Sequence, residues 1–194
     1  MFINWGLGEL NLKLVYYGPA LSGKTTNLQY IHARTPAHLR GRLVSLKTQQ
    51  ERTLLFDFLQ LEIGKINNLK PKFKLYTVPG QVYYAASRRL ILQGTDGVVF
   101  VVDSQAGRMA ENQESWLTME QHLMELGCDI ATFPIIVQCN KRDLPHVLSV
   151  AQIRQYLGIK QRPIFEASAT KGNGVFDTLK AVMNSVIAQV RQPA

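Results

Sequence analysis

The sequence predicts an α/β fold with a largely parallel central sheet, and two observations lead to this prediction. Segments typical of strands alternate with segments typical of helices, which is the pattern of parallel strands joined by crossover helices. A glycine-containing loop at residues 18–25 also lies between a predicted strand at residues 10–17 and a predicted helix that starts at Thr25. The 194 residues suffice for a substantial core, and we expect one domain over residues 1–194.

The further strands are expected from short apolar or alternating stretches. Apolar residues alternate with polar ones before the turn pair Pro79-Gly80, whereas two other stretches are continuously apolar, as in buried strands. The predicted strands are residues 72–77, 97–103, 134–137 and 163–167, with residues 41–46 as a candidate. Residues 51–63 are apolar and aromatic, and their periodicity does not decide between strand and helix.

The helices are expected from apolar residues at helical spacing. Trp116, Met119, Leu123 and Leu126 form one such stripe, which we interpret as core. The closing helix carries a longer stripe from Phe176 to Val190. Two further helices are predicted at residues 82–92 and 150–157.

Residues 18–25 match the phosphate-binding pattern G-x-x-x-x-G-K-[ST] at every fixed position. Gly18 and Gly23 allow backbone angles that residues with a Cβ resist, so the N–H groups of the loop can turn inward around an anion. Lys24 would place a positive charge on the β- and γ-phosphates, and Thr25 would offer a hydroxyl to Mg²⁺. The dipole of the next helix adds to this attraction. The alternative is an ordinary glycine turn before a helix.

Composition excludes several classes of protein. With 46% hydrophobic and 19% charged residues, the chain is globular in type. Its longest clean apolar run, residues 98–102, is far shorter than the about 20 residues of a membrane span, and the first cation, Lys13, comes too late for a signal peptide. Cys128 and Cys139 make no disulfide framework, so we expect a cytoplasmic protein.

The net charge of +8 is unevenly placed. Residues 1–97 hold 13 Lys and Arg against 5 Asp and Glu, whereas residues 98–194 are balanced. The lysines at 65, 70, 72 and 74 cluster around a predicted strand, where they could attract an anionic partner or a membrane face. We favour the interpretation that they are solvated lysines of a loop and a sheet edge. No motif that reads nucleic acid accompanies the charge, so we expect no such partner.

A second motif, Asn140-Lys-Arg-Asp143, follows the predicted strand at residues 134–137. Ligands of such sheets bind at the carboxyl ends of the strands. The carboxylate of Asp143 can accept two hydrogen bonds from the N1–H and the exocyclic amine of guanine, and adenine offers no such donor pair. The amide of Asn140 would brace the loop or reach the purine, and the stem of Lys141 could cover the base. A backbone N–H near Ala169 could meet the guanine oxygen; the alternative there is a plain strand-to-helix turn.

With these motifs the whole chain resembles the Ras-like small GTPases, and more narrowly the bacterial MglA family of polarity switches. The narrower resemblance is carried by residues 15–19, 23–31, 51–54, 76–81, 140–145 and 174–179. It implies a P-loop NTPase fold, a Ras-like three-layer sandwich, that binds GTP or GDP with Mg²⁺ and hydrolyses GTP. The residues assigned to the nucleotide are Gly18, Leu21, Ser22, Gly23, Lys24, Thr25, Thr26, Gly80, Asn140, Lys141, Asp143, Ser168 and Ala169.

The resemblance also assigns the segment at residues 77–81. Small GTPases usually carry an aspartate that holds Mg²⁺ through water, and Thr77 replaces it here, as in the MglA family. Asp57 is a candidate substitute. Gly80 could bond a γ-phosphate oxygen through its N–H, and Gln81 would orient the attacking water.

By resemblance, Thr53 is the switch threonine that closes on Mg²⁺ and Arg52 is an arginine finger supplied by the same chain. The alternative for Arg52 is a solvated or ion-paired side chain. Ala20 lies where most relatives carry glycine, and its methyl group would crowd the γ-phosphate, so we expect slow intrinsic hydrolysis and a long-lived GTP state.

The resemblance finally implies partners. We expect a monomer whose GTPase-activating protein is a homodimeric roadblock-domain protein of the MglB type, with effectors that govern polarity or motility at the cell poles or the membrane. One rival interpretation is a scaffold that binds nucleotide and hardly hydrolyses it. The other, an ATP-using P-loop enzyme, is disfavoured by the motif at residues 140–143.

Overall fold

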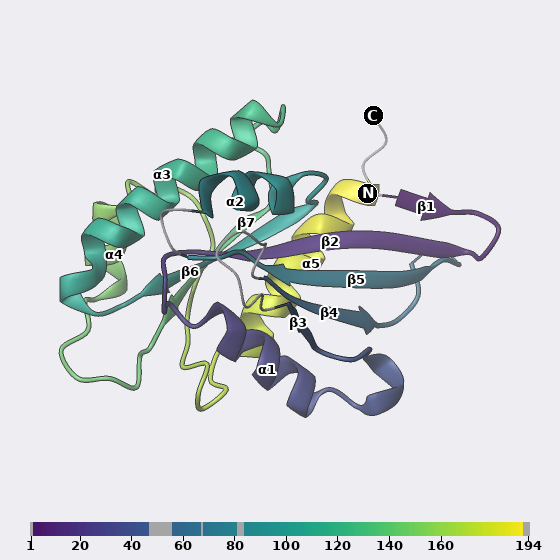
Figure 1. Cartoon of the computed structure of the whole chain (residues 1–194), viewed down its shortest axis with the longest axis horizontal. Helices are drawn as coiled ribbons and strands as arrows, with labels where there is room; N and C mark the ends of the chain where they lie inside the picture. The colour runs from purple at the N-terminus through teal and green to yellow at the C-terminus, as the bar shows by residue number, and fades with distance from the viewer. Residues whose placement is uncertain (1, 47–55, 67, 81–83, 192–194) are drawn as a thin grey trace.

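A computed structural model describes residues 2–46, 56–66, 68–80 and 84–191 of the protein. The described residues form one mixed sheet in the order β3-β4-β5-β2-β6-β7-β8, with β1 paired to β2 (Figure 1). The strands are β1 Phe2–Asn4, β2 Glu9–Tyr17, β3 Val44–Leu46, β4 Phe56–Glu62, β5 Lys70–Thr77, β6 Gly97–Asp103, β7 Ile135–Asn140 and β8 Ile164–Glu166. The predicted α/β fold is confirmed.

Most of this sheet is parallel. Strands β5, β2, β6, β7 and β8 run in one direction, and β3, β4 and β1 pair antiparallel with their neighbours. Every residue of β6 is buried, which explains its continuous apolar sequence, whereas buried and half-buried residues alternate over most of β4 and β5. Parallel strands place their carboxyl ends at one edge of the sheet, and that edge carries both sequence motifs.

Helices cover both faces of the sheet. Helices α1 (Lys24–Arg34) and α5 (Val175–Arg191) pack on one face, and α2 (Ala85–Leu92), α3 (Met109–Glu125) and α4 (Val150–Tyr156) pack on the other (Figure 1). Each face has its own apolar core. The core beneath α1 and α5 includes Leu28 and Leu179, and the core beneath α2, α3 and α4 includes Trp116 and Ile153. The sheet with its two helical layers is the three-layer arrangement that the resemblance implied.

The structure also resolves the open points of the sequence analysis. The part of residues 51–63 that is described forms strand β4, and the candidate strand at residues 41–46 is present as the shorter β3. Strand β7 extends to Asn140, so the second motif begins inside the strand. Strand β1 was not predicted, because three residues are too few for an alternation to be recognised.

One interpretation was wrong. Lys70, Lys72 and Lys74 were assigned to a sheet edge, but they lie on β5, which has β4 on one side and β2 on the other. Lys72 instead forms an ion pair with Glu9 on β2 at 2.6 Å and a longer one with Glu62 on β4 at 3.6 Å. This lysine therefore links three adjacent strands, and protection of an edge does not explain it.

A buried amide pair links the layers beneath the site. The side chains of Asn27 on α1 and Gln138 on β7 exchange hydrogen bonds of 2.8 and 3.0 Å, and Gln138 also donates to the hydroxyl of Thr178 on α5 at 3.2 Å. All three side chains are fully buried. Because buried polar groups are costly when unpaired, this network specifies how α1 and α5 dock on the sheet.

We therefore expect Gln138→Ala to lower the free energy of unfolding by about 1–3 kcal/mol, because Asn27 and Thr178 lose a buried partner. Chemical denaturation of the unliganded protein measures this. Gln155→Ala on the exposed side of α4 is the matched control and should change stability little. An unfolding midpoint equal to that of the wild type would contradict the structural role of the pair.

Candidate nucleotide-binding site

The phosphate loop connects β2 to α1 and is shaped by two glycines. Gly18 and Gly23 have φ angles of 144° and 100°, which L-residues rarely adopt. A Cβ on Gly18 would overlap the carbonyl oxygen of Val101 on β6, and a Cβ on Gly23 would overlap the amide nitrogen of Asn140. The loop therefore lies against two neighbouring strands, and only glycine fits at both positions.

Lys24 lies beneath this loop. Its Nζ donates to the carbonyl oxygens of Gly18 at 2.9 Å and Pro19 at 2.6 Å, and the residue is 7% exposed. Burial is the main cause that lowers the pKa of Lys24 to about 7, and the positive charge of Arg88 lowers it further. The negative charge of Asp57 acts in the opposite direction. A bound polyphosphate would supply the negative charge that this buried ammonium needs, which makes the loop fit an anion.

A carboxylate lies next to Thr25. Asp57 on β4 is buried and accepts hydrogen bonds from Thr25 Oγ1 at 2.6 Å and Thr77 Oγ1 at 3.0 Å through Oδ2, and from Ser45 Oγ at 2.6 Å through Oδ1. The backbone N–H of Asp57 also donates to Thr77 Oγ1 at 2.8 Å. Thr77 and Asp57 thus lie side by side on adjacent strands, and the carboxylate comes from β4. Mg²⁺ prefers oxygen ligands such as hydroxyls and carboxylates, so the neighbouring side chains of Thr25 and Asp57 suit this ion.

Gly80 contacts the phosphate loop from the side of β5. A Cβ on Gly80 would lie 2.7 Å from the carbonyl carbon of Pro19 and closer still to the backbone of Ala20. No side chain can occupy this space without moving the loop. Gly80 therefore lies directly against Pro19 and Ala20 of the phosphate loop.

Asn140 joins the phosphate loop to the loop that follows β8. Its Nδ2 donates to the carbonyl oxygen of Ser22 at 2.7 Å, and its Oδ1 accepts from the N–H of Ala169 at 2.9 Å. The residue is 2% exposed, so both bonds are shielded from water. Of the two roles left open for this amide, the structure has the bracing one. The N–H of Ala169 is engaged here and does not face the cavity freely.

Lys141 extends along the site from the next position. It has a positive φ of 66°, and its Nζ donates to Asp103 Oδ2 at 2.7 Å at the end of β6. Arg108 forms a longer ion pair with the same buried carboxylate at 3.7 Å and donates to the carbonyl oxygen of Ala20 at 3.1 Å. Asp103 thereby links Lys141 to Arg108, and Arg108 in turn bonds the phosphate loop at Ala20. Neither Asp103 nor Arg108 was predicted from the sequence, where the available signal was a carboxylate at the end of a fully apolar strand.

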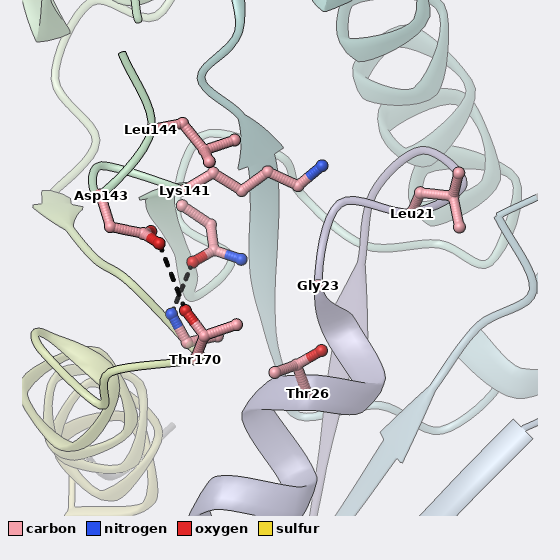
Figure 2. A pocket seen from close by; sticks show the side chains of 9 residues that line it. Leu21, Gly23, Thr26, Lys141, Asp143, Leu144 and Thr170 are labelled. Carbon is pink, nitrogen blue, oxygen red and sulfur yellow. Dashed lines mark hydrogen bonds between the residues drawn. The ribbon is translucent and has the colours of Figure 1, made fainter.

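A cavity of about 220 Å³ lies between the phosphate loop on one side and the loops that follow β7 and β8 on the other (Figure 2). Leu21, Gly23 and Thr26 lie on the side of the phosphate loop and α1, and Asp143 and Thr170 lie across from them. This volume is below the roughly 300–1,000 Å³ of whole small-molecule sites, and it has room for one ring system between the residues that line it.

Asp143 is prepared to act as an acceptor. It is exposed, and a hydrogen bond from the Ser168 side chain is the main cause that lowers the pKa of its carboxyl below the usual value. The hydroxyl of Thr170 also approaches Asp143 Oδ2 at 3.4 Å. The carboxylate is therefore ionised at neutral pH and can accept two N–H groups of a planar ring at once.

The structure brings together every predicted nucleotide-binding residue. They lie on the loops at the carboxyl edge of the sheet, in the first turn of α1 and at the end of β7: Gly18, Leu21, Ser22, Gly23, Lys24, Thr25, Thr26, Gly80, Asn140, Lys141, Asp143, Ser168 and Ala169. Arg52, Thr53 and Gln81 fall outside the described residues. Within the described ranges no group of three or more His, Cys, Asp or Glu side chains could hold a metal ion, and no helix could cross a membrane.

This fold and this site define a small GTPase of the Ras-like class. A model of the ADP-ribosylation factor family matches residues 5–186. The chain is 52% identical over 191 residues to the mutual gliding-motility protein MglA of Myxococcus xanthus (strain DK1622), with 98% of each chain covered. It is 30% identical over 107 residues to the ADP-ribosylation factor-like protein 4D of Mus musculus, which covers 55% of this chain and 51% of that one.

The chain therefore belongs to the ADP-ribosylation factor family of small GTPases and, within the bacterial Ras-like members, to the MglA family.

The pKa of Lys24 predicts proton uptake on nucleotide binding. With a free-state pKa of about 7, Lys24 loses its proton as the pH rises above 7, and a bound polyphosphate raises that pKa again. Calorimetry of GDP binding at about pH 8.5, in buffers of different ionisation enthalpy, should show uptake of close to one proton, and affinity should fall by up to about tenfold per pH unit above 7.

At about pH 6 both states carry a charged Lys24, so this contribution should vanish there. An absence of uptake at the higher pH would mean that the lysine is already charged in the unliganded protein.

Proposed function

We propose that this protein is a GTP/GDP switch that hydrolyses GTP slowly, is accelerated by a partner protein, and controls cell polarity or gliding motility. The observation that carries the nucleotide part of this proposal is the buried Asn140. It holds Ser22 of the phosphate loop and Ala169 of the opposite loop through one side chain. The phosphate and base compartments therefore have a defined separation, as one ligand with a polyphosphate and a purine requires.

The base compartment favours guanine. The ionised Asp143 can accept the N1–H and the exocyclic amine of guanine, and adenine would leave this carboxylate without donors. Discrimination of this kind is strong, because an unpaired polar group is costly. The stem of Lys141, held by Asp103, is placed to cover one face of the ring. Since the N–H of Ala169 bonds Asn140, the guanine oxygen would meet a neighbouring N–H of the same loop or displace that bond.

The phosphate compartment fits a polyphosphate with Mg²⁺. Lys24 and the N–H groups at the start of α1 would hold the phosphates, and the hydroxyl of Thr25 would ligate the ion, joined by Thr53. When bound, Mg²⁺ neutralises charge on the β- and γ-phosphates. Asp57 would orient Thr25 and a metal-bound water, in place of the aspartate that Thr77 replaces. Its 2.6 Å bond to Thr25 supports this assignment.

We assign hydrolysis to Gly80, Gln81 and Arg52. Gly80, held against Pro19 and Ala20, would offer its N–H to the γ-phosphate, and Gln81 would orient the attacking water. Arg52 would neutralise charge that develops on the phosphate oxygens. Gly80 lies against the backbone of Ala20, and this contact supports the expectation that the Ala20 methyl group crowds the γ-phosphate and slows intrinsic turnover.

The partner and the cellular role are proposed from the similarity to MglA. That relative is named for mutual gliding motility, and it covers nearly the whole of this chain. We expect a homodimeric roadblock-domain protein of the MglB type to stimulate hydrolysis, and effectors to bind the GTP state of a monomeric, cytoplasmic protein. Hydrolysis would release the segments around residues 52–58 and 80–84 and so end effector binding.

Asp57→Asn should lower the apparent affinity for Mg²⁺ by about 10–100-fold, because the amide keeps the shape of the side chain but removes its charge. The rate of GDP release as a function of Mg²⁺ concentration measures this affinity without any reaction. Glu114→Gln on the exposed face of α3 is the matched control. A variant with wild-type Mg²⁺ dependence would exclude Asp57 from the metal site.

The experiment that tests the proposed function is single-turnover GTP hydrolysis with Mg²⁺, with and without the roadblock-domain protein. Stimulated hydrolysis is expected, and Arg52→Ala should slow it by about 10³-fold while GDP affinity stays near the wild-type value. Gln81→Leu should slow it as well. An unchanged rate for Arg52→Ala would remove its finger role.

Ala20 favours a second candidate function, a GTP-locked scaffold. Tight GTP binding without hydrolysis, with or without the partner, would support that candidate and contradict the switch.

A further inference from the structure

The hairpin formed by β1 and β2 exposes three large apolar side chains. Phe2 is 65% exposed, Trp5 is 77% exposed and Leu7 is 64% exposed. Trp5 and Leu7 lie in the turn that ends at Gly8. Single exposed apolar residues are common, but here a tryptophan, a leucine and a phenylalanine lie within six positions of one short hairpin, which we call the apolar tip.

This tip lies at the opposite end of the sheet from the nucleotide site. Strand β2 begins directly after the turn and runs to the phosphate loop (Figure 1). Nine strand residues at about 3.3 Å each separate the turn from Gly18 by roughly 30 Å. The tip is therefore outside the guanine and phosphate compartments, and no step of the proposed switch uses it.

Two lysines lie at the same end of the sheet as the apolar tip. Strand β5 begins beside the hairpin, where the N–H of Lys70 donates to the carbonyl oxygen of Gly8 at 2.7 Å, and Lys65 lies in the preceding connection. Both lysines are exposed, and neither forms an ion pair within the part of the chain that the structure describes. The nearby carboxylates of Glu9 and Glu62 are already paired with Lys72. The surface around the tip is thus positively charged.

We propose that this tip, made of Phe2, Trp5 and Leu7 with Lys65 and Lys70, docks the protein directly on an anionic lipid bilayer. Tryptophan prefers the headgroup region of membranes, where its ring is buried and its N–H stays hydrated. Leucine and phenylalanine would enter the acyl boundary, and the lysines would contact anionic headgroups. Docking in this way leaves the nucleotide edge of the sheet free for protein partners.

The shape of the tip favours a bilayer over a protein. A stable protein interface buries about 800 Å² on each side with complementary packing, and three separately projecting side chains on a two-stranded turn offer little of that. Pairing of β1 with a second copy would involve a strand of only three residues. A bilayer needs no complementary shape, and the insertion of a few side chains together with charge attraction suffices.

The test is co-sedimentation of the full GDP-loaded protein with vesicles of phosphatidylcholine that contain about 30 mol% phosphatidylglycerol, and with pure phosphatidylcholine vesicles. Binding should be seen with the anionic vesicles and should weaken with salt. Lys65→Gln and Lys70→Gln should each reduce the partition coefficient about fivefold. Trp5→Ala combined with Leu7→Ala should reduce it by at least about tenfold.

Fluorescence reports which residue enters the bilayer. The chain has two tryptophans, and Trp116 is buried at 4% exposure, so in a Trp116→Phe background the emission comes from Trp5 alone. Its spectrum should shift to the blue when anionic vesicles are added. Control substitutions away from the tip are Leu117→Ala on α3 and Lys180→Gln on α5, which remove an exposed apolar and an exposed basic side chain.

Several results would overturn the proposal. These are absence of binding to anionic vesicles, equal loss of binding in the tip variants and the control variants, and an unshifted Trp5 spectrum in the bound protein. A concentration-dependent dimer that Trp5→Ala dissolves, without vesicle binding, would assign the tip to a second copy instead. GDP binding by every variant verifies folding and keeps this test independent of GTP hydrolysis.

Discussion

The buried amide of Asn140 is the interaction on which the nucleotide site depends. Its two ends hold Ser22 and Ala169, which belong to loops that are far apart in the sequence, and its side chain lies against Gly23. Because the group is shielded from water, loss of either bond would leave a polar atom unpaired. The distance between the phosphate compartment and the base compartment is therefore determined by one side chain at the end of β7.

The other parts of the site lie at the carboxyl ends of the parallel strands. β2 leads into the phosphate loop, β6 ends at Asp103, and β7 ends at Asn140. Arg108 and Lys141 both form ion pairs with the buried carboxylate of Asp103, and Arg108 also bonds the carbonyl oxygen of Ala20. The phosphate loop and the base compartment are therefore also linked through this carboxylate. Below this edge the amide pair of Asn27 and Gln138 keeps α1 in position.

Asp57 lies on the strand next to Thr77 and contacts the phosphate-loop threonine. Thr77 has no carboxylate, but the adjacent antiparallel strand places Asp57 within hydrogen-bond distance of both Thr77 and Thr25. A negative charge is thus kept next to the hydroxyl of the phosphate loop. The two side chains can meet because paired strands in a sheet set opposite side chains only about 5 Å apart.

The sequence by itself determined the fold class, most of the strands and helices, and the two nucleotide motifs, because these depend on local periodicity and on fixed spacings. Only the tertiary structure decided that β5 lies inside the sheet, that Asn140 braces two loops, that the candidate Asp57 contacts Thr25, and that Asp103 contacts Lys141. Such features arise from pairing between residues distant along the chain, such as Thr25 with Asp57, and no local pattern records them. Strand β1 and its exposed tip also required the structure, since three residues carry too weak a signal.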